Sequence, residues 1–239
     1  MGELDRPAAM RRLNFSKAGA LGRLHFIARC QDIGGCFTIS RLNWIFLFIS
    51  LVPPTRSLSF DANASRHQIP TLVENFSLLD QEAQSRELYH QNGARAVVLI
   101  FTTTGCPIVQ KSIPKIKALR DEFASKGVIF WLINPTPEDD TESIRDEARQ
   151  FGIDWPILLD RSQSVARSLG VTRTAEAFCV NLKTRCLFYR GAIDDQLGYG
   201  TERKKVGHAY LRDALSNFLS GKKINPARTE VRGCRIQLH

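Results

Sequence analysis

Short runs of consecutive apolar residues alternate with amphipathic stretches from about residue 96 onward. The apolar runs are rich in β-branched residues and have the length of strands buried on both faces. The predicted strands are 96–101, 128–133, 156–159, 177–180 and 186–189. Apolar residues at helical spacing predict helices over 107–124, 141–151, 162–169 and 208–219. This order predicts an α/β domain whose mixed central sheet is covered by helices on both faces.

The first quarter of the chain lacks this pattern. A mostly apolar stretch at 42–52 follows a basic region, ends at two prolines, and precedes the small residues Ala62-Asn63-Ala64. A basic flank, a short apolar core and a small-x-small site describe a secretory signal peptide. We therefore expect residues 1–64 to be an extension with a signal-peptide-like or anchor segment, and residues 65–239 to be the folded domain with a C-terminal tail. The alternative is that 42–52 forms a buried strand or short helix.

Composition and charge exclude several classes of protein. The 239 residues are 43% apolar and 24% charged, which is typical of a globular chain and not of a collagen-like or wholly disordered one. No apolar run reaches 18 residues, so a standard membrane-spanning helix is not expected. The net charge is +9, but residues 1–57 hold 8 Lys and Arg against 3 acidic residues. Because a nucleic-acid-binding domain would concentrate its basic residues on one face, no nucleic-acid partner is expected.

Four of the six cysteines lie in the predicted domain. They are Cys106, Cys179, Cys186 and Cys234. An even count in an exported protein favours disulfides. With 181–184 as the turn of the predicted hairpin, Cys179 lies opposite Cys186 and within reach of a bridge, whereas a shift of the turn by one residue leaves two buried thiols. No pair has zinc-site spacing, so neither a metal nor a cofactor is expected.

The junction between the first strand and the first helix carries the strongest candidate for chemistry. It reads Thr-Thr-Thr-Gly-Cys-Pro over 102–107, where Gly105 permits a tight turn and Pro107 suits the first turn of a helix. Cys106 is thereby placed at a helix N-terminus, where free amides and the helix dipole favour the thiolate. We predict a reactive thiol, and the alternative is a buried structural cysteine.

Several motifs resemble the thioredoxin-fold superfamily, in particular redoxin or peroxiredoxin-like domains of the alkyl hydroperoxide reductase and thiol-specific antioxidant group. Pro114 lies eight residues after Cys106, at the place of the kinking proline of the thioredoxin active-site helix. Thr103 completes the Thr-x-x-Cys of peroxiredoxins, and Tyr-Arg-Gly-Ala-Ile-Asp-Asp at 189–195 resembles exported bacterial redoxins. The resemblance covers residues 69–239 and implies a thioredoxin-like fold with thiol redox chemistry at Cys106.

The chain also departs from the family pattern. Val109 stands where a dithiol oxidoreductase has its second cysteine, and Leu99 stands where a peroxiredoxin has a proline. Ala175 occupies the place of the superfamily's cis-proline, and we expect a trans bond there because a non-proline cis bond costs about 3 kcal/mol. Glu176 lies near the place of the peroxiredoxin arginine, for which Arg173 is the nearest substitute.

A single reactive cysteine needs a second thiol to turn over. If Cys179 pairs with Cys186, only Cys234 remains in the domain, on a polar tail that we expect to be mobile. A C-terminal resolving cysteine is also what the resembling families often use. The predicted catalytic residues are Cys106, Thr103, Cys234 and Arg173.

These residues predict an exported thiol redox protein of the periplasm or cell envelope, either a thiol-disulfide oxidoreductase or a peroxiredoxin-like antioxidant. Its expected partners are protein or small-molecule thiols, disulfides or peroxides, together with an external reductant, and its N-terminal segment could attach it to a membrane. The alternative is a non-catalytic module on a redoxin scaffold, such as a copper-handling or assembly protein that uses Cys106 and another thiol as soft ligands.

Three further residues are weaker candidates for chemistry. Asp194 and Asp195 could act as paired carboxylates, but adjacent side chains on an extended chain point in opposite directions, which favours a structural role in a turn. His208 could serve as a base for Cys106, although a histidine at a helix start more often caps the helix or lies on the surface.

Overall fold

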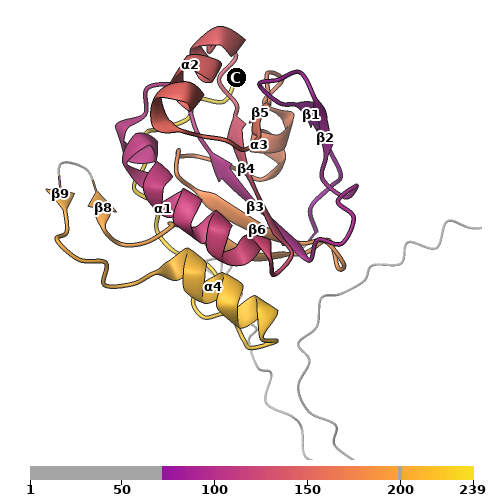
Figure 1. The fold of residues 1–239 in the computed structure, drawn as a ribbon, viewed down its shortest axis with the longest axis vertical. Coiled ribbons are helices and arrows are strands. Elements are labelled where there is room, and N and C mark those ends of the chain that lie inside the picture. Colours follow the sequence, from indigo (N-terminus) through magenta and orange to yellow (C-terminus); the bar gives the residue numbers. More distant parts are fainter. Residues whose placement is uncertain (1–71, 199–200) are drawn as a thin grey trace, which may run out of the picture. The chain divides into compact units, whose positions relative to one another are not determined.

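The computed structural model describes residues 72–198 and 201–239, and the expectations for residues 1–64 lie outside the described residues. The central sheet has the spatial order β5 (Ile157–Leu159), β4 (Val128–Asn134), β3 (Ala96–Phe101), β6 (Ala177–Asn181) and β7 (Leu187–Gly191). β5, β4 and β3 run parallel to one another, β6 runs antiparallel to β3, and β7 runs antiparallel to β6. Figure 1 labels β3 to β6 of this sheet. The helices are α1 (Pro107–Ala124), α2 (Thr141–Phe151), α3 (Ser164–Ser168) and α4 (Tyr210–Leu219). The predicted mixed α/β sheet is confirmed.

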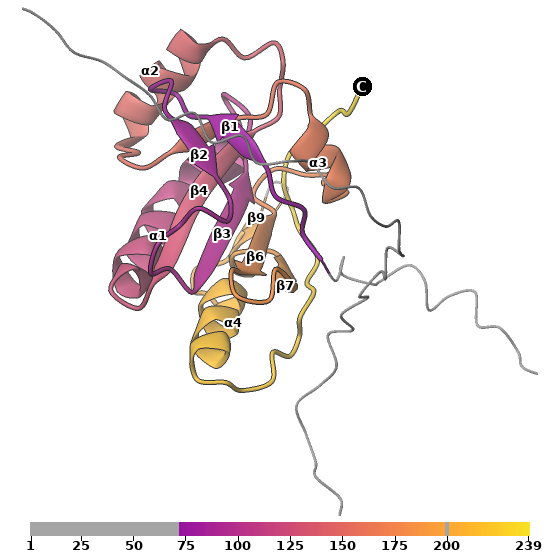
Figure 2. The same cartoon turned by 90° about the vertical axis from the view of Figure 1, so that its right-hand side faces the viewer.

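Alternate residues of the central strands face two separate cores. Val98 and Ile100 of β3 pack with α1, α2 and α4 on one face of the sheet. Val97, Leu99 and Phe101 pack with α3 on the other face, and Figure 2 shows helices on both sides. All six residues of β3 are completely buried, which explains why this run has no polar alternation.

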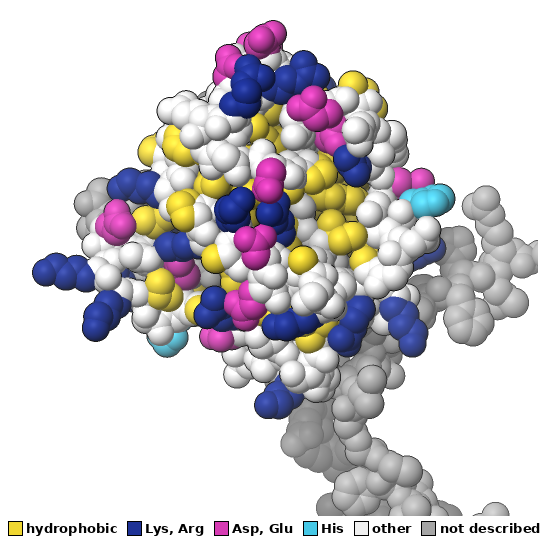
Figure 3. Space-filling view, viewed as in Figure 1, with side chains coloured by type: hydrophobic (Ala, Val, Ile, Leu, Met, Phe, Trp, Pro, Cys, Tyr) yellow, Lys and Arg dark blue, Asp and Glu magenta, His cyan; other side chains and the backbone are white. Residues whose placement is uncertain are grey.

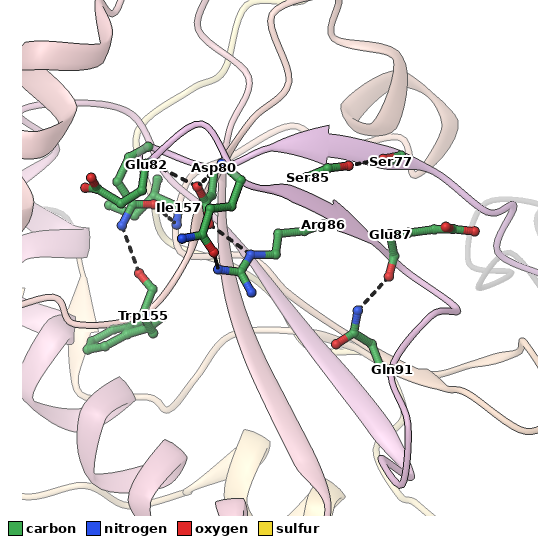
Figure 4. A network of polar contacts seen from close by, with 11 residues as sticks. Ser77, Asp80, Glu82, Ser85, Arg86, Glu87, Gln91, Trp155 and Ile157 are labelled. Carbon is green, nitrogen blue, oxygen red and sulfur yellow. Dashed lines mark hydrogen bonds and ion pairs between the residues drawn. The ribbon is translucent and has the colours of Figure 1, made fainter.

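A short hairpin that the sequence pattern did not predict covers one edge of the sheet. It consists of β1 (Ser77–Leu79) and β2 (Ser85–Glu87). The buried carboxylate of Asp80 accepts a hydrogen bond from Arg86 Nε at 2.9 Å and two more from turn amides, as Figure 4 shows. Gln81 then joins the hairpin to β5, because its Oε1 accepts the amide of Ile157 at 2.7 Å. Two three-residue strands held by side-chain contacts leave no periodic signal in the sequence.

The hairpin of β6 and β7 has a different register from the predicted one. Val180 pairs with Leu187, and Cys179 pairs with Tyr189 across a bulge. Cys186 instead lies opposite Asn181, whose amide donates to the Cys186 carbonyl at 2.9 Å. Cys179 is a fully buried free thiol, and this burial raises its pKa well above the usual range. The predicted bridge between Cys179 and Cys186 is therefore wrong.

The basic side of α1 is neutralised by acidic residues from other elements. The ion pairs are Lys111 with Glu202, Lys115 with Asp194, Lys117 with Asp154 and Arg120 with Asp154. Glu202 belongs to β9 (Thr201–Glu202), which pairs with β8 (Leu197–Gly198). On the face shown in Figure 3, basic and acidic side chains are interspersed over α1 and its surroundings. This face therefore presents no continuous field of positive charge.

Candidate active site

The loop between β3 and α1 places Cys106 immediately before the helix. Gly105 has φ +78°, the left-handed conformation that glycine adopts without strain. Pro107 begins α1, where its missing amide leaves no hydrogen bond unmade. Pro114 lies inside the helix, at the position named by the resemblance. Cys106 thus lies at the carboxyl end of a central strand and at the positive end of an 18-residue helix.

Two carboxylates hold the loop that precedes Cys106. The amide of Thr104 donates to Asp139 Oδ2 at 2.7 Å, and the amide of Gly105 donates to Glu147 Oε1 at 3.0 Å. Glu147 Oε1 also accepts Gln110 Nε2 at 2.7 Å, which connects α2 to the first turn of α1. These contacts fix the loop, and sequence reasoning did not identify either carboxylate. No local signal marks them, because Asp139 lies in the loop between β4 and α2 and Glu147 lies in α2, and only the folded chain brings both to this loop.

The C-terminal segment brings Cys234 to Cys106. Their Sγ atoms lie 3.0 Å apart, and Cys106 is 3% exposed. The segment runs beside the strand-like residues before β6, where the amide of Thr174 donates to the Cys234 carbonyl at 2.9 Å and the amide of Ile236 donates to the Thr172 carbonyl at 3.0 Å. Ile236 is buried in the core that contains α3. The tail is therefore docked at Cys234, in contrast to the predicted mobile tail.

The hydroxyl of Thr174 joins the two cysteines. Its Oγ1 lies 3.0 Å from the Cys106 Sγ and accepts the amide of Cys234 at 2.8 Å. Thr174 is completely buried. Sequence reasoning identified the adjacent Ala175 as the residue in the place of the cis-proline but did not single out Thr174. The available signal was its position directly before the residue that replaces the cis-proline.

The two thiols differ in acidity. Burial by itself raises the pKa of Cys106, but donors from the Cys234 thiol, the Thr174 hydroxyl and the amides of Val109 and Cys234 together bring the pKa below its ordinary value. The pKa of Cys234 is raised by burial and by the hydrogen bond and negative charge of Cys106. The arrangement therefore favours a thiolate at Cys106 and a protonated thiol at Cys234.

The other two predicted catalytic residues make different contacts. The carbonyl of Thr103 accepts the amide of Cys106 at 3.3 Å, whereas the hydroxyl next to the sulfur belongs to Thr174. Arg173 Nη1 donates to the Gly233 carbonyl at 3.0 Å. Arg173 thus helps to hold the tail backbone, and the structure brings together Cys106 and Cys234 from the predicted set.

Glu176 is bound in a structural ion pair with Arg190 and not to the Cys106 thiol. Its Oε1 accepts Arg190 Nε at 2.6 Å, and the two side chains are 6% and 8% exposed. Arg190 also donates to the carbonyls of Leu169 and Gly170, so its charge is fully engaged. The bond before Ala175 is trans, as expected, and Ala175 has φ +58°.

The weaker candidates for chemistry, Asp194, Asp195 and His208, lie between β7 and α4. Asp194 Oδ2 pairs with Lys115 Nζ at 2.6 Å. Asp195 Oδ1 accepts the amides of Gly207 at 2.8 Å and His208 at 3.0 Å. The exposed ring of His208 stacks on Tyr210. All three residues therefore stabilise the approach to α4.

A cavity of about 340 Å³ is lined by sequence neighbours of the thiol pair, although neither Cys106 nor Cys234 lines it. Its walls include Ile108, two residues beyond Cys106, and Ala175, which follows Thr174. The loop at 192–195 and the tail residues 230–232 complete the wall. Among the described residues, no cluster of three or more His, Cys, Asp or Glu side chains could hold a metal ion.

A cysteine at the start of α1, beside a mixed sheet with helices on both faces, defines a thioredoxin-like redox domain. Residues 69–193 match the AhpC/TSA family, and the chain belongs to this family. Cys234 lies beyond the matched segment, so the family match includes one of the two adjacent thiols.

Curated relatives include proteins named thiol-disulfide oxidoreductase ResA. The protein from Bacillus thuringiensis (strain Al Hakam) is 26% identical over 154 residues, covering 64% of this chain and 82% of the relative. That of Halalkalibacterium halodurans is 27% identical over 124 residues, covering 52% and 68%. These relatives and the family together support a thiol redox function.

Solved structures share the fold. A hypothetical protein from Sinorhizobium meliloti 1021 superimposes with a TM-score of 0.65 and 27% identity, covering 72% of this chain and 96% of that one. An uncharacterized conserved protein from Geobacillus kaustophilus gives 0.62 and 24%, covering 72% and 93%.

Proposed function

We propose that this protein is a thiol-disulfide oxidoreductase in which Cys106 attacks a disulfide and Cys234 resolves the mixed disulfide. The observation that carries the proposal is the 3.0 Å between the two sulfurs, with their pKa values shifted in opposite directions. Val109 occupies the usual position of a resolving cysteine, and Cys234 takes that role from the C-terminal segment.

The reaction proceeds in two exchanges. The Cys106 thiolate attacks one sulfur of the substrate disulfide, a mixed disulfide forms at Cys106, and the other substrate sulfur leaves as a thiolate. Cys234 then loses its proton to that leaving thiolate and attacks the Cys106 sulfur, which releases the second substrate thiolate. The substrate gains two electrons, and the protein is left with a disulfide between Cys106 and Cys234. An external dithiol resets this disulfide by the same exchange.

Three features favour a disulfide over a peroxide as the substrate. Leu99 stands where a peroxiredoxin has its proline, and Glu176 is held by Arg190 in the buried ion pair. The curated relatives, in addition, are named for disulfide chemistry. Protein disulfides are thus the proposed substrate class, with peroxide as the competing class that the experiment below tests.

A protein disulfide can reach Cys106 only after the tail moves. With 3% of its surface exposed and Cys234 at 3.0 Å, Cys106 is shielded in the docked state. The residues around Cys234 are held by backbone hydrogen bonds to 172–174, and these bonds would have to break for the tail to move. The cavity has tail residues 230–232 in its wall. Once the tail has moved, the substrate would reach the Cys106 sulfur through this cavity.

We also propose that the protein is exported to the periplasm or cell envelope. The support is the apolar stretch 42–52 behind a basic region and before Ala62-Asn63-Ala64. This stretch would either be removed as a signal peptide or retained as a membrane anchor. Within residues 72–198 and 201–239, no helix has both the length and the apolar character needed to cross a bilayer.

The two-cysteine mechanism is tested by trapping its intermediate. The reduced Cys234→Ser variant, mixed with one equivalent of glutathione disulfide, should accumulate a glutathione adduct at Cys106, whereas the unmodified protein should release both glutathione thiols. Cys106→Ser should give no adduct, and Cys179→Ala should behave as the unmodified protein.

Two outcomes would contradict this proposal. Faster oxidation of Cys106 by hydrogen peroxide than by glutathione disulfide would move the function to the peroxide class. Stoichiometric Cu(I) binding that needs both Cys106 and Cys234, without any exchange with disulfides, would identify a binding module.

A further inference from the structure

Thr174 contacts both halves of the redox pair through one atom. Its Oγ1 lies 3.0 Å from the Cys106 Sγ and 2.8 Å from the Cys234 amide nitrogen. A backbone amide only donates, so Oγ1 accepts the hydrogen bond from Cys234. The hydroxyl has one proton, which is then free to point toward the sulfur of Cys106.

Thr174 is also held firmly in place. It is completely buried, and it precedes Ala175, whose amide donates to the Phe101 carbonyl at the end of β3 at 2.7 Å. The amide of Thr174 binds the Cys234 carbonyl at 2.9 Å. The residue is thus attached to the central sheet on one side and to the tail on the other.

The donors to Cys106 fall into two groups. The Cys234 thiol and the Cys234 amide come from the tail, which must move to admit a substrate. The Thr174 hydroxyl and the Val109 amide come from the sheet and from α1, which stay in place. When the tail moves, Thr174 therefore supplies the side-chain donor that remains at the sulfur.

We propose that Thr174 is the positioning residue of this site: its hydroxyl sustains the Cys106 thiolate while the tail is displaced, and it aligns Cys234 for attack when the tail docks. This inference rests on the proposed two-cysteine mechanism. It assigns the hydroxyl beside the Cys106 sulfur to Thr174, whereas the sequence motif had pointed to Thr103.

The first test measures the thiolate directly. Three proteins that all carry Cys234→Ser are compared: one keeps Thr174, one has Thr174→Val and one has Thr174→Ser. The quantity measured is the pH dependence of Cys106 alkylation by iodoacetamide. Thr174→Val removes the hydroxyl at nearly constant volume and should move the midpoint up by about one to two pH units, because a hydrogen bond to a charged group is lost. Thr174→Ser should restore it. The carboxylates of Asp139 and Glu147, which hold the loop, are unchanged in all variants.

Thr172→Val is the matched control, because it removes a hydroxyl from the same segment while Thr172 binds the tail through its carbonyl. Its midpoint should equal that of the Cys234→Ser background. A merely structural role for Thr174 would lower the melting temperature without moving the midpoint. Equal midpoints for Thr174→Val and Thr172→Val would overturn the proposal, as would a failure of Thr174→Ser to restore the lower value.

The second test measures the alignment of Cys234. With both cysteines present, redox equilibrium against glutathione is measured at a pH below the Cys106 midpoint of every variant, where stabilisation of the thiolate does not contribute. Under this condition Thr174→Val should weaken the disulfide between Cys106 and Cys234 at least about tenfold, whereas Thr172→Val should leave it unchanged. An unchanged equilibrium in Thr174→Val would contradict the alignment role. Absence of that disulfide from the unmodified protein would instead contradict the two-cysteine mechanism itself, so the two failures are distinguishable.

Discussion

The backbone of Gly233 passes so close to Thr174 that a Cβ atom on residue 233 would lie 1.9 Å from the Thr174 carbonyl oxygen. No real side chain tolerates that separation, and the obstructing atom belongs to the backbone. Glycine at this position therefore allows the tail to lie against the segment before β6, which is what brings Cys234 to Cys106.

Gly233→Ala should prevent the tail from docking. We expect the equilibrium constant of the disulfide between Cys106 and Cys234 to fall at least about tenfold, which corresponds to ~1.4 kcal/mol. Cys106 should at the same time react faster with a bulky maleimide, because its cover is displaced. Glu230→Ala, an exposed change in the same tail, is the control and should leave both quantities unchanged. A Gly233→Ala protein with the original equilibrium constant would show that the tail docks differently.

The two thiols of the pair should titrate in a fixed order. Because the pKa of Cys106 lies below and that of Cys234 above the ordinary thiol value, alkylation of Cys106 should rise through its midpoint at a lower pH than that of Cys234. Peptide mass spectrometry after a brief pulse of iodoacetamide at each pH measures both rates. Cys234→Ala should raise the midpoint of Cys106, since a thiol donor is lost. Preferential labelling of Cys234 at low pH would reverse the assigned roles.

The ion pair between Glu176 and Arg190 should contribute strongly to stability. Glu176→Gln leaves the buried guanidinium without its counter-charge, and we expect the free energy of unfolding in urea to fall by about 3 kcal/mol. The double variant Glu176→Gln with Arg190→Met should recover part of this loss, because no unpaired charge remains. Glu230→Gln, on the surface, should change stability by less than about 0.5 kcal/mol. Equal effects of the two Glu→Gln changes would contradict a buried ion pair.

The N-terminal extension gives a separate prediction. If 42–52 is a signal-peptide core, the mature protein recovered from the cell envelope should begin near Ala64. N-terminal sequencing measures this directly. If the protein keeps residues 42–52 and is released from the membrane only by detergent, the stretch is an anchor. A soluble protein that begins at Met1 would contradict both the signal peptide and the anchor.

Much of the fold could be predicted because local pattern and burial agree. The run Ala96–Phe101 is apolar throughout, and such a strand is stable only with helices on both faces. Gly105 and Pro107 likewise marked the start of α1 with Cys106 before it, since their backbone preferences are intrinsic. The register of the second hairpin could not be predicted, because its bulge between Cys179 and Val180 depends on how the strand packs.

The site itself was only half predictable. Cys106 carries a local signal, and Cys234 was reached by elimination through a disulfide between Cys179 and Cys186 that the structure contradicts. The contact between the sulfurs nevertheless exists, because Gly233 and Thr174 bring the tail to the sheet. Thr174 carried no motif, and its role follows from two distances that only the folded chain defines.

The most direct test of the account is the disulfide that one turnover leaves behind. Fully reduced protein is mixed with one equivalent of glutathione disulfide, alkylated, digested without reduction and analysed by mass spectrometry. We predict a peptide cross-link between Cys106 and Cys234, with Cys179 left as a free thiol that reacts only after unfolding. A cross-link of Cys106 or Cys234 to any other cysteine, or Cys106 and Cys234 both recovered as alkylated thiols, would contradict the central claim.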